Sequence, residues 1–308
     1  MKKILITGAT SFIGSALIKK LHNDLKIYAV VRPHSTKINT IKPYNNVNII
    51  ECEYSDYNSL SSKIKDEIDC AILLTWDGVR GQKREDKILQ EKNYLYNMDA
   101  VKECIKMNVS SIITGGSQAE YGIINYEQKV KESALCKPKS QYGMSKLKLY
   151  NSCKDICEKN NIRLIEPRFF SLYGPNDNPQ TMIIDILKKM INSEKCDLTE
   201  CRQIWDFLYI DDAIDALECL IFSNTSKGIY NFGSGISKPL KEYVEEMRTL
   251  TKTKSVINYG VIPYSRDGII NTNPDVTKLM TEFEWKPRTS FTNGISNIIE
   301  DILNDKKS

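Results

Sequence analysis

Tyr142 and Lys146 are the residues of this 308-residue sequence with the clearest capacity for acid–base chemistry. On a helix, side chains four residues apart project from the same face. A nearby ammonium lowers the pKa of a phenol, so that it can exchange a proton with a carbonyl or an alcohol. Ser117, at the end of an expected strand, can hydrogen-bond to the same oxygen. We predict that these three residues are catalytic.

The beginning of the sequence predicts a binding place for a pyrophosphate. An apolar run at 4–6 is followed by a glycine-containing turn and a helical pattern at 15–21, which indicates strand, turn and helix. Such a turn directs free backbone N–H groups and the positive end of a helix dipole at one point. Gly8 permits the sharp turn and Gly14 permits close helix–strand packing, while Ser11 replaces the usual middle glycine. An ordinary turn without a ligand is the alternative. The predicted cofactor contacts here are Gly8, Thr10, Ser11, Phe12, Ile13 and Gly14.

The residue after the second expected strand bears on the choice of cofactor. This strand, at 26–31, follows the turn by about twenty residues, as a βαβ unit requires, and ends in Arg32. NAD sites usually carry a carboxylate here, whereas a guanidinium pairs well with a 2′-phosphate. We therefore favour NADP(H), with NAD(H) as the alternative. The competing interpretation is that Arg32 is a solvated loop residue.

The following segments alternate between strand and helix patterns. Strands are expected at 47–52, 69–74 and 111–114, and helices at 57–68, 86–108 and 142–157. This alternation predicts an α/β fold with a Rossmann-type, doubly wound parallel sheet and right-handed crossovers. Ligands bind at the carboxyl ends of such strands. Glu53 or Asp56 is expected near the adenine ring, although Asp56 could equally cap the next helix. The remaining predicted cofactor contacts are Thr75, Asn93 and Phe170, besides Lys146.

The second half of the chain has a less regular pattern. Its most loop-like stretches are 176–180 and 261–274. We predict a dinucleotide-binding domain over 1–174, with a returning segment near 205–235, and a smaller C-terminal lobe over 175–308 that is mostly substrate-binding.

Composition argues against several classes of protein. The net charge of +4 comes from scattered lysines, which suits an anionic small molecule and gives no nucleic-acid stripe. No signal peptide is recognisable, and no apolar run approaches the roughly 18 residues of a membrane span. Nine cysteines without a Cys-x-x-Cys pair, and only two histidines, predict reduced thiols and no metal site. We expect a cytoplasmic protein without a membrane or nucleic-acid partner.

Together, the motifs resemble the extended short-chain dehydrogenase/reductase family, in its branch of NAD(P)-dependent nucleotide-sugar epimerases, dehydratases and reductases. The resemblance covers nearly the whole chain. It rests on the turn at 7–14, Ser117 with Tyr121-Gly122, the pair Tyr142 and Lys146, and the segments 168–175 and 205–213. It implies that Tyr142 is the acid/base, that Lys146 holds the ribose and tunes the phenol, and that Ser117 orients the substrate oxygen. It places 168–175 under the nicotinamide. It also implies a homodimer that buries the helices at 86–108 and 142–157.

Departures from the family pattern narrow the predicted activity. Family dehydratases carry an Asp-Glu pair directly after the serine or threonine that corresponds to Ser117, where this chain has Gln118 and Ala119. Glu120 is one position off and is expected to point to the other side of an extended segment. Fucose-synthase-type members use a cysteine and a histidine, whose places hold Ala119 and Gln180. Both chemistries are therefore disfavoured.

The resemblance also suggests where a nucleotide sugar binds. Trp205 stands where many relatives carry a phosphate-gripping arginine, Arg202 lies three residues upstream, and Arg266 matches a second such arginine. Arg202 could instead form a surface salt bridge, and Trp205 could pack on a sugar or in the core. Ser171 replaces a substrate-contacting asparagine. The predicted substrate contacts are Trp76, Gln118, Ser171, Arg202, Trp205 and Arg266.

The segments 76–78, 116–122 and 205–207 are similar to those of CDP-abequose-synthase-like and dTDP-6-deoxyhexose 4-reductase-like members. The sequence therefore predicts an NADPH-dependent reduction of a nucleotide-linked 4-keto-6-deoxyhexose at C4, for surface-polysaccharide sugar synthesis. The alternative is an NAD-dependent nucleotide-sugar 4-epimerase. A non-catalytic dinucleotide sensor is disfavoured, because such proteins usually lose the tyrosine or the lysine.

Overall fold

The computed structural model describes residues 1–124, 127–264 and 269–305, and the chain divides into two compact units. The first unit comprises Met1–Gly122, Glu132–Phe169 and Ile214–Asn231. The second comprises Ile123–Lys131, Phe170–Ala213 and the chain from Phe232 onward. This division gives two units, and the assignment of one to the cofactor and the other to the substrate stays a prediction.

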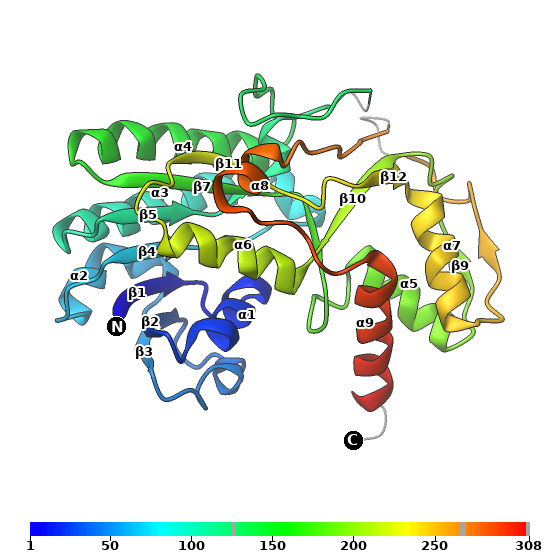
Figure 1. The fold of residues 1–308 in the computed structure, drawn as a ribbon, viewed down its shortest axis with the longest axis horizontal. Helices are drawn as coiled ribbons and strands as arrows, with labels where there is room; N and C mark the ends of the chain where they lie inside the picture. Colours follow the sequence, from blue (N-terminus) through cyan, green and yellow to red (C-terminus); the bar gives the residue numbers. More distant parts are fainter. Residues whose placement is uncertain (125–126, 265–268, 306–308) are drawn as a thin grey trace. The chain divides into compact units, whose positions relative to one another are not determined.

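The first unit is built on a parallel sheet with the strand order β11-β7-β5-β4-β1-β2-β3, with β6 beside β7 (Figure 1). Parallel pairing joins β1 to β2 and β4, β2 to β3, β4 to β5, and β7 to β5 and β6. The chain runs outward from β1 to β3 and then crosses to β4 on the other side of β1, which makes a topological switch point between β1 and β4. The predicted Rossmann-type parallel sheet is confirmed. The strands are β1 (Lys2–Thr7), β2 (Leu25–Val31), β3 (Val47–Glu51), β4 (Cys70–Leu73), β5 (Ser111–Thr114), β6 (Gly116–Ser117), β7 (Arg163–Phe169) and β11 (Gly228–Phe232).

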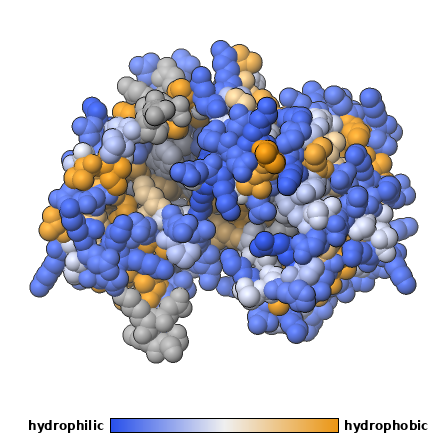
Figure 2. Space-filling model, turned by 180° about the vertical axis from the view of Figure 1, so that it is seen from behind, coloured by the Kyte–Doolittle hydropathy of each residue, from blue (hydrophilic) through white to orange (hydrophobic). Residues whose placement is uncertain are grey.

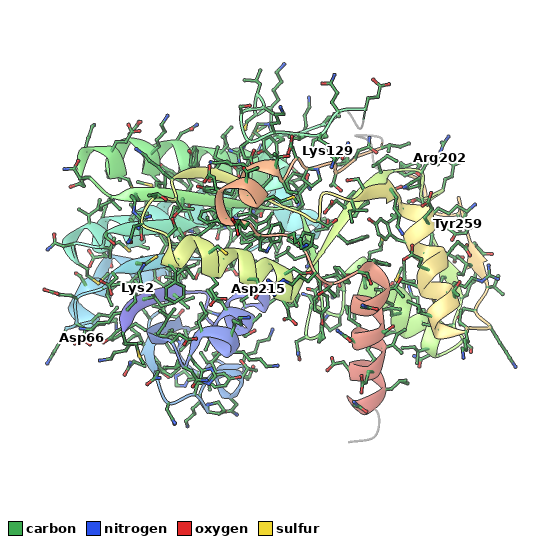
Figure 3. The ribbon with its side chains drawn as sticks, viewed as in Figure 1. Lys2, Asp66, Lys129, Arg202, Asp215 and Tyr259 are labelled. Atoms are coloured by element: carbon green, nitrogen blue, oxygen red, sulfur yellow. The ribbon has the colours of Figure 1, made fainter. Side chains whose placement is uncertain are left out.

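Helices cover this sheet because each strand alternates its side chains between two apolar layers. One layer joins strand residues such as Leu5, Ala71 and Ile112 to Val101 of α3 and Cys153 of α4 in a single buried cluster. Elsewhere in the unit, α1 and α6 are linked by an ion pair between Lys20 and Asp215, whose N···O distance is 2.9 Å (Asp215 is labelled in Figure 3). The helices are α1 (Phe12–Leu21), α2 (Leu60–Lys63), α3 (Lys87–Lys106), α4 (Gln141–Lys159) and α6 (Ile210–Phe222), with short 3-10 turns η1 (Ile38–Thr40), η2 (Tyr54–Ser59), η3 (Gly81–Glu85) and η4 (Gln118–Glu120).

The helix predicted at 57–68 is wrong in extent. Only four residues form α2, and the preceding η2 contains a non-helical residue, Asp56, with φ −105° and ψ 16°. Ile64 has already returned to an extended conformation. Tyr54, Tyr57 and Leu60 are buried in the core, so tertiary burial rather than helical period sets the path of this segment.

The second unit has a three-stranded sheet in the order β12-β10-β8 and a two-stranded sheet of β13 and β9. An aromatic cluster packs within it, in which the ring of Phe207 lies 5.9 Å from Tyr173, 5.0 Å from Tyr243 and 5.6 Å from Phe291 between centroids. Buried Asp212 accepts hydrogen bonds from the backbone N–H groups of Arg288 and Thr289. The elements are β8 (Ser171–Tyr173), α5 (Met182–Ile191), β9 (Cys196–Asp197), β10 (Ile204–Tyr209), β12 (Ser237–Pro239), α7 (Leu240–Thr251), β13 (Ile257–Asn258), α8 (Thr277–Phe283) and α9 (Phe291–Asp305).

The surface is mostly polar, with hydrophobic residues in scattered patches on the face that Figure 2 shows. Among the described residues, no helix is both long and apolar enough to cross a membrane. The same part of the chain holds no cluster of three or more histidine, cysteine, aspartate or glutamate side chains that could bind a metal ion.

Candidate active site

The turn between β1 and α1 has the close packing that its glycines predict. Gly8 has φ +66°, and its carbonyl accepts a hydrogen bond from the Ser11 N–H at 2.9 Å. A Cβ atom on Gly14 would lie 2.4 Å from the Gly8 carbonyl oxygen, so only glycine fits. Ser11 caps α1, since its Oγ accepts from the Gly14 N–H at 3.1 Å. The cradle therefore fits a pyrophosphate at a helix N-terminus, with a capping serine in place of the middle glycine. Thr10, Phe12 and Ile13, all partly buried, complete the turn.

The predicted contacts at the ends of β2 and β3 are exposed. Arg32 follows β2 directly, and its carbonyl accepts a hydrogen bond from the Ser35 N–H at 3.2 Å, while its side chain is exposed. Glu53 precedes η2 and is also exposed. Asp56 lies inside η2 rather than at a helix start, so the capping role considered for it is not observed. Arg32 and Glu53 are accessible to a ligand at this edge of the sheet.

A hydrogen-bond network fixes the loop after β4. The Tyr57 hydroxyl lies 2.8 Å from Thr75 Oγ1, and the carbonyl of Thr75 accepts hydrogen bonds from Tyr54 and Asn97. Asn93 is fully buried, and its side-chain amide pairs with both backbone groups of Asp77, at 2.8 and 3.0 Å. Asn93 thus holds the loop in place, and its direct contact with a cofactor stays a prediction.

Tyr142 and Lys146 both lie near the start of α4, as predicted. Ser140 caps this helix by accepting from the Gly143 N–H at 3.1 Å. The Lys146 Nζ donates to the Gly115 carbonyl at 2.6 Å. Burial raises the pKa of Tyr142, opposed by hydrogen bonding with Ser117. Burial lowers the pKa of Lys146 to about 8. A lysine tuned toward neutral pH beside a phenol that hydrogen-bonds with a serine is suited to proton transfer.

Two aromatic–cation contacts surround this pair. The Lys146 Nζ lies 3.8 Å from the ring centroid of Trp76, and the Arg84 guanidinium lies 4.7 Å from that of Tyr142. Sequence reasoning assigned Trp76 to the substrate and did not identify Arg84. No spacing motif signals these contacts, because both residues come from irregular chain after β4.

A buried charge cluster lies behind Ser117. The Ser117 N–H donates to Glu120 Oε1 at 2.7 Å, and its Oγ accepts from the Ala119 N–H. Arg168 lies 2.9 Å from Glu120 and 3.0 Å from Glu166. The expectation that Glu120 points to the other side of an extended segment is wrong, because 118–120 form a 3-10 turn that directs its carboxylate inward. Glu166 and Arg168 are two residues apart on β7, and this spacing could have predicted that their side chains share one face of the strand.

Gln118 begins η4 and is partly buried. Phe170 and Ser171 lie at the start of the second unit. The Phe170 N–H donates to the Phe232 carbonyl at 3.0 Å, and Ser171 pairs with Phe207 in the register of β8 and β10. Their contacts with cofactor and substrate stay predictions.

The predicted phosphate and sugar contacts of the second unit differ in exposure. Arg202, labelled in Figure 3, forms an exposed ion pair with Glu200, which is the surface salt bridge considered for it. Trp205 lies on β10, partly buried, with its ring 6.4 Å from that of Phe207. Arg266 lies outside the described residues.

Three features define the class of extended short-chain dehydrogenases/reductases. They are a parallel sheet with a topological switch point, a Gly-x-x-Ser-x-x-Gly turn packed against α1, and a buried Tyr-x-x-x-Lys pair. The sequence model of the NAD dependent epimerase/dehydratase family matches residues 4–233, and the chain belongs to that family. It is therefore an NAD(P)-dependent enzyme of the nucleotide-sugar-modifying type.

Individual relatives match over nearly the full length. CDP-abequose synthase of Salmonella muenchen is 28% identical over 316 residues, covering 97% of each chain. The solved structure of UDP-glucose 4-epimerase from Thermotoga maritima, with UDP-glucose, superposes with a TM-score of 0.89 at 18% identity, covering 99% of each chain. That of Thermus thermophilus UDP-glucose 4-epimerase, in complex with NAD, has a TM-score of 0.87 at 18% identity and covers 98% of this chain and 99% of the other. At these identities, the two structures establish the shared fold.

Proposed function

We propose that this enzyme uses NADPH to reduce the C4 keto group of a nucleotide-linked 4-keto-6-deoxyhexose, in the synthesis of a surface-polysaccharide sugar. The observation that carries the proposal is a complete Ser117–Tyr142–Lys146 set without the carboxylate pair of a dehydratase. Gln118 and Ala119 occupy the positions of that pair, and the nearby carboxylate of Glu120 is engaged by Arg168. The 28% identity with CDP-abequose synthase over the full length supports the same branch.

Each residue of the site has a separate role in the proposed reaction. A nicotinamide dinucleotide, when bound, would supply the hydride that reduces C4. The Tyr142 phenol delivers a proton to the C4 oxygen, and Ser117 orients that oxygen by a hydrogen bond. Lys146 holds the ribose and, as an ammonium, favours the phenolate that remains. Gly8 and Gly14 leave room for the pyrophosphate at α1, and the exposed Arg32 suits a 2′-phosphate.

An NAD-dependent nucleotide-sugar 4-epimerase is the second candidate. It is favoured by the description of the matching family, which names epimerases. The same tyrosine–lysine pair would take the C4 hydroxyl proton and later return it, while tightly bound NAD would accept the C4 hydride and give it back, so that the cofactor is regenerated in each turnover.

The fate of the cofactor distinguishes the two candidates. The protein is incubated with NADPH and CDP-, dTDP-, UDP- or GDP-linked 4-keto-6-deoxy sugars, and the loss of NADPH is followed by ultraviolet absorbance. Stoichiometric consumption with one of these nucleotides supports reduction. Purification with bound NAD, and interconversion of C4 epimers without net redox change, would establish the epimerase instead.

Substitution of the acid/base tests the role of Tyr142. Tyr142→Phe removes the proton donor and is expected to lower turnover by about 10²- to 10⁴-fold, with cofactor binding retained. Tyr150→Phe, on the same helix, is the matched control and should keep its activity. Unchanged turnover in Tyr142→Phe would show that Tyr142 is not the acid/base, and the absence of turnover in the wild type with every sugar nucleotide would favour the non-catalytic sensor.

A further inference from the structure

The indole of Trp76 contacts both members of the Tyr142–Lys146 pair. The Lys146 Nζ lies over its ring, 3.8 Å from the centroid. The Tyr142 and Trp76 rings meet edge to face, with centroids 6.0 Å apart and an interplanar angle of 87°. The first geometry is that of a cation–π interaction and the second that of a favourable aromatic pair. One side chain thus touches the acid/base and the ammonium that tunes it.

The indole is held by groups other than the reacting pair. Its Nε1–H donates to Gln90 Oε1 at 2.8 Å. Gln90 is fully buried, and its Nε2 donates to the carbonyls of Gly78 and Lys83 at 3.0 and 2.9 Å. One carboxamide therefore fixes the ring and the neighbouring loop together. The orientation of Trp76 is set by this network within the first unit.

The charged groups around Lys146 determine how much the indole contributes to stabilising its ammonium. Glu120 on η4 and Glu166 on β7 favour the ammonium of Lys146 only when they are ionised. Arg168, 2.9 and 3.0 Å from them, offsets the charge of the one carboxylate that remains when Glu166 keeps its proton. Among the described residues, no carboxylate forms a salt bridge with Lys146. Its direct contacts are the Gly115 carbonyl and the indole face.

The remaining charges face the phenol. The guanidinium of Arg84 lies over the Tyr142 ring, and the charges of Arg84 and Arg80 both favour the phenolate. Since burial disfavours an ammonium, the π face of Trp76 supports the charged form of Lys146 together with the hydrogen bond to the Gly115 carbonyl.

We propose that Trp76 is a positioning residue for the catalytic pair, keeping the Lys146 side chain charged and in place with its π face and fixing the Tyr142 ring by edge-to-face packing. This extends the prediction that Trp76 contacts the substrate. Only the expected effect of Trp76 on turnover rests on the proposed function.

The contact is tested on the intact protein without substrate, by NMR titration of lysine labelled at the ε-carbon. The Lys146 signal is identified by its absence in Lys146→Met. Loss of a cation–π contact removes support for the charged form, so the titration midpoint should fall by about one pH unit in Trp76→Leu and by less in Trp76→Phe. Trp285→Phe, which alters a buried indole of the second unit, is the matched control and should leave the midpoint unchanged. Equal midpoints in the wild type and Trp76→Leu would overturn the proposal.

A second readout needs only the wild type. Methylene protons beside an ammonium above an indole face are shifted upfield by the ring current, so the Lys146 ε-protons should lie upfield of those of the exposed lysines. An ordinary chemical shift would contradict the contact even if Trp76→Leu fails to fold.

Turnover separates the proposal from the proposed function. With an accepted 4-keto sugar nucleotide, the alkaline limb of kcat should move to lower pH in Trp76→Leu, with KM for the sugar nearly unchanged. A raised KM with an unchanged pH profile would make Trp76 a sugar contact and overturn the proposal. If no such sugar is reduced, the proposed function fails, while the titration still decides the role of Trp76.

Discussion

Two carboxylates share one guanidinium in the interior beside Ser117. Glu120, Glu166 and Arg168 are each at most 2% exposed. Burial raises the pKa of both carboxyls, and that of Glu166 lies well above its usual range, since it also faces the charge of Glu120. One cation compensates one anion, so Glu166 is the member that retains its proton.

This protonation predicts how stability depends on pH. A carboxyl whose pKa is higher in the folded state than its usual 4.5 binds protons more tightly when folded, so its contribution to stability is lost as pH rises above that value. Glu166→Gln imitates the protonated form and should flatten the decline in unfolding free energy as the pH rises above the usual carboxyl pKa of 4.5. Urea unfolding at several pH values measures this. Glu91→Gln, which alters an exposed ion pair with Lys148, is the control, and equal slopes in Glu166→Gln and the wild type would contradict the account.

Arg32 is expected to select between cofactors. Arg32→Ala removes a charge-assisted contact with a 2′-phosphate and should weaken NADPH binding by about 10- to 100-fold, leaving NADH binding nearly unchanged. Fluorescence titration with both cofactors measures this, with Lys42→Ala, another exposed cation between β2 and β3, as the control. No loss for either cofactor would show that Arg32 is a solvated loop residue, and an equal loss for both would contradict a contact with the 2′-phosphate.

Spacing in the sequence was sufficient to place Tyr142 and Lys146 together on one helix but not to predict their surroundings. Tyr142 and Lys146 share a face because the helical period places i and i+4 together. Trp76 and Arg84 contact them from a loop and a 3-10 turn, whose paths follow no period. The inward turn of Glu120 depends on its partner Arg168, which lies 48 residues away in sequence and on a different strand.

At the scale of elements, the approach of α1 to the end of β1 determines the cofactor cradle. Gly8 adopts a left-handed conformation, and Gly14 lies against its carbonyl. Ser11 then closes the first turn of α1 with its side chain. The helix N-terminus is thereby directed at the turn, where an anion is favoured.

Gly14→Ala tests this packing. The added Cβ would meet backbone oxygen at 2.4 Å, so α1 must shift, at a cost of about 1–3 kcal/mol in unfolding free energy and with loss of cofactor affinity. Denaturant unfolding and cofactor titration measure the two effects. Gly115→Ala is the control for stability, because its Cβ would meet no atom closer than a Leu74 methyl carbon at 3.4 Å. Unchanged stability and affinity in Gly14→Ala would show that the cradle is less tightly packed.

Strands and long helices were predicted well because buried apolar runs and helical spacing are local signals. The helix from Lys87 to Lys106 and that from Gln141 to Lys159 both agree with the expected ranges within two residues at each end. The short helix after β3 was overestimated, because Tyr54 and Tyr57 are drawn into the core and interrupt helical geometry at Asp56. Such tertiary burial overrides local propensity.

At the scale of the whole molecule, the fold is shared with proteins whose sequences have diverged widely, since a solved structure with 18% sequence identity superposes with a TM-score of 0.89. The predicted homodimer, with the helices at 86–108 and 142–157 buried between subunits, stays a prediction. Family membership defines the type of chemistry, while the direction of net hydride transfer and the sugar are properties of this enzyme to be measured.

Deuterium transfer tests the central claim most directly. NADPH carrying deuterium at the transferred position of the nicotinamide is incubated with the accepted 4-keto-6-deoxy sugar nucleotide, and the product is examined by NMR and mass spectrometry. The account predicts one deuterium at C4 for each NADPH oxidised, and none with Tyr142→Phe over the same time. A product that carries no deuterium at C4, or C4 epimers formed while NADPH remains, would contradict it.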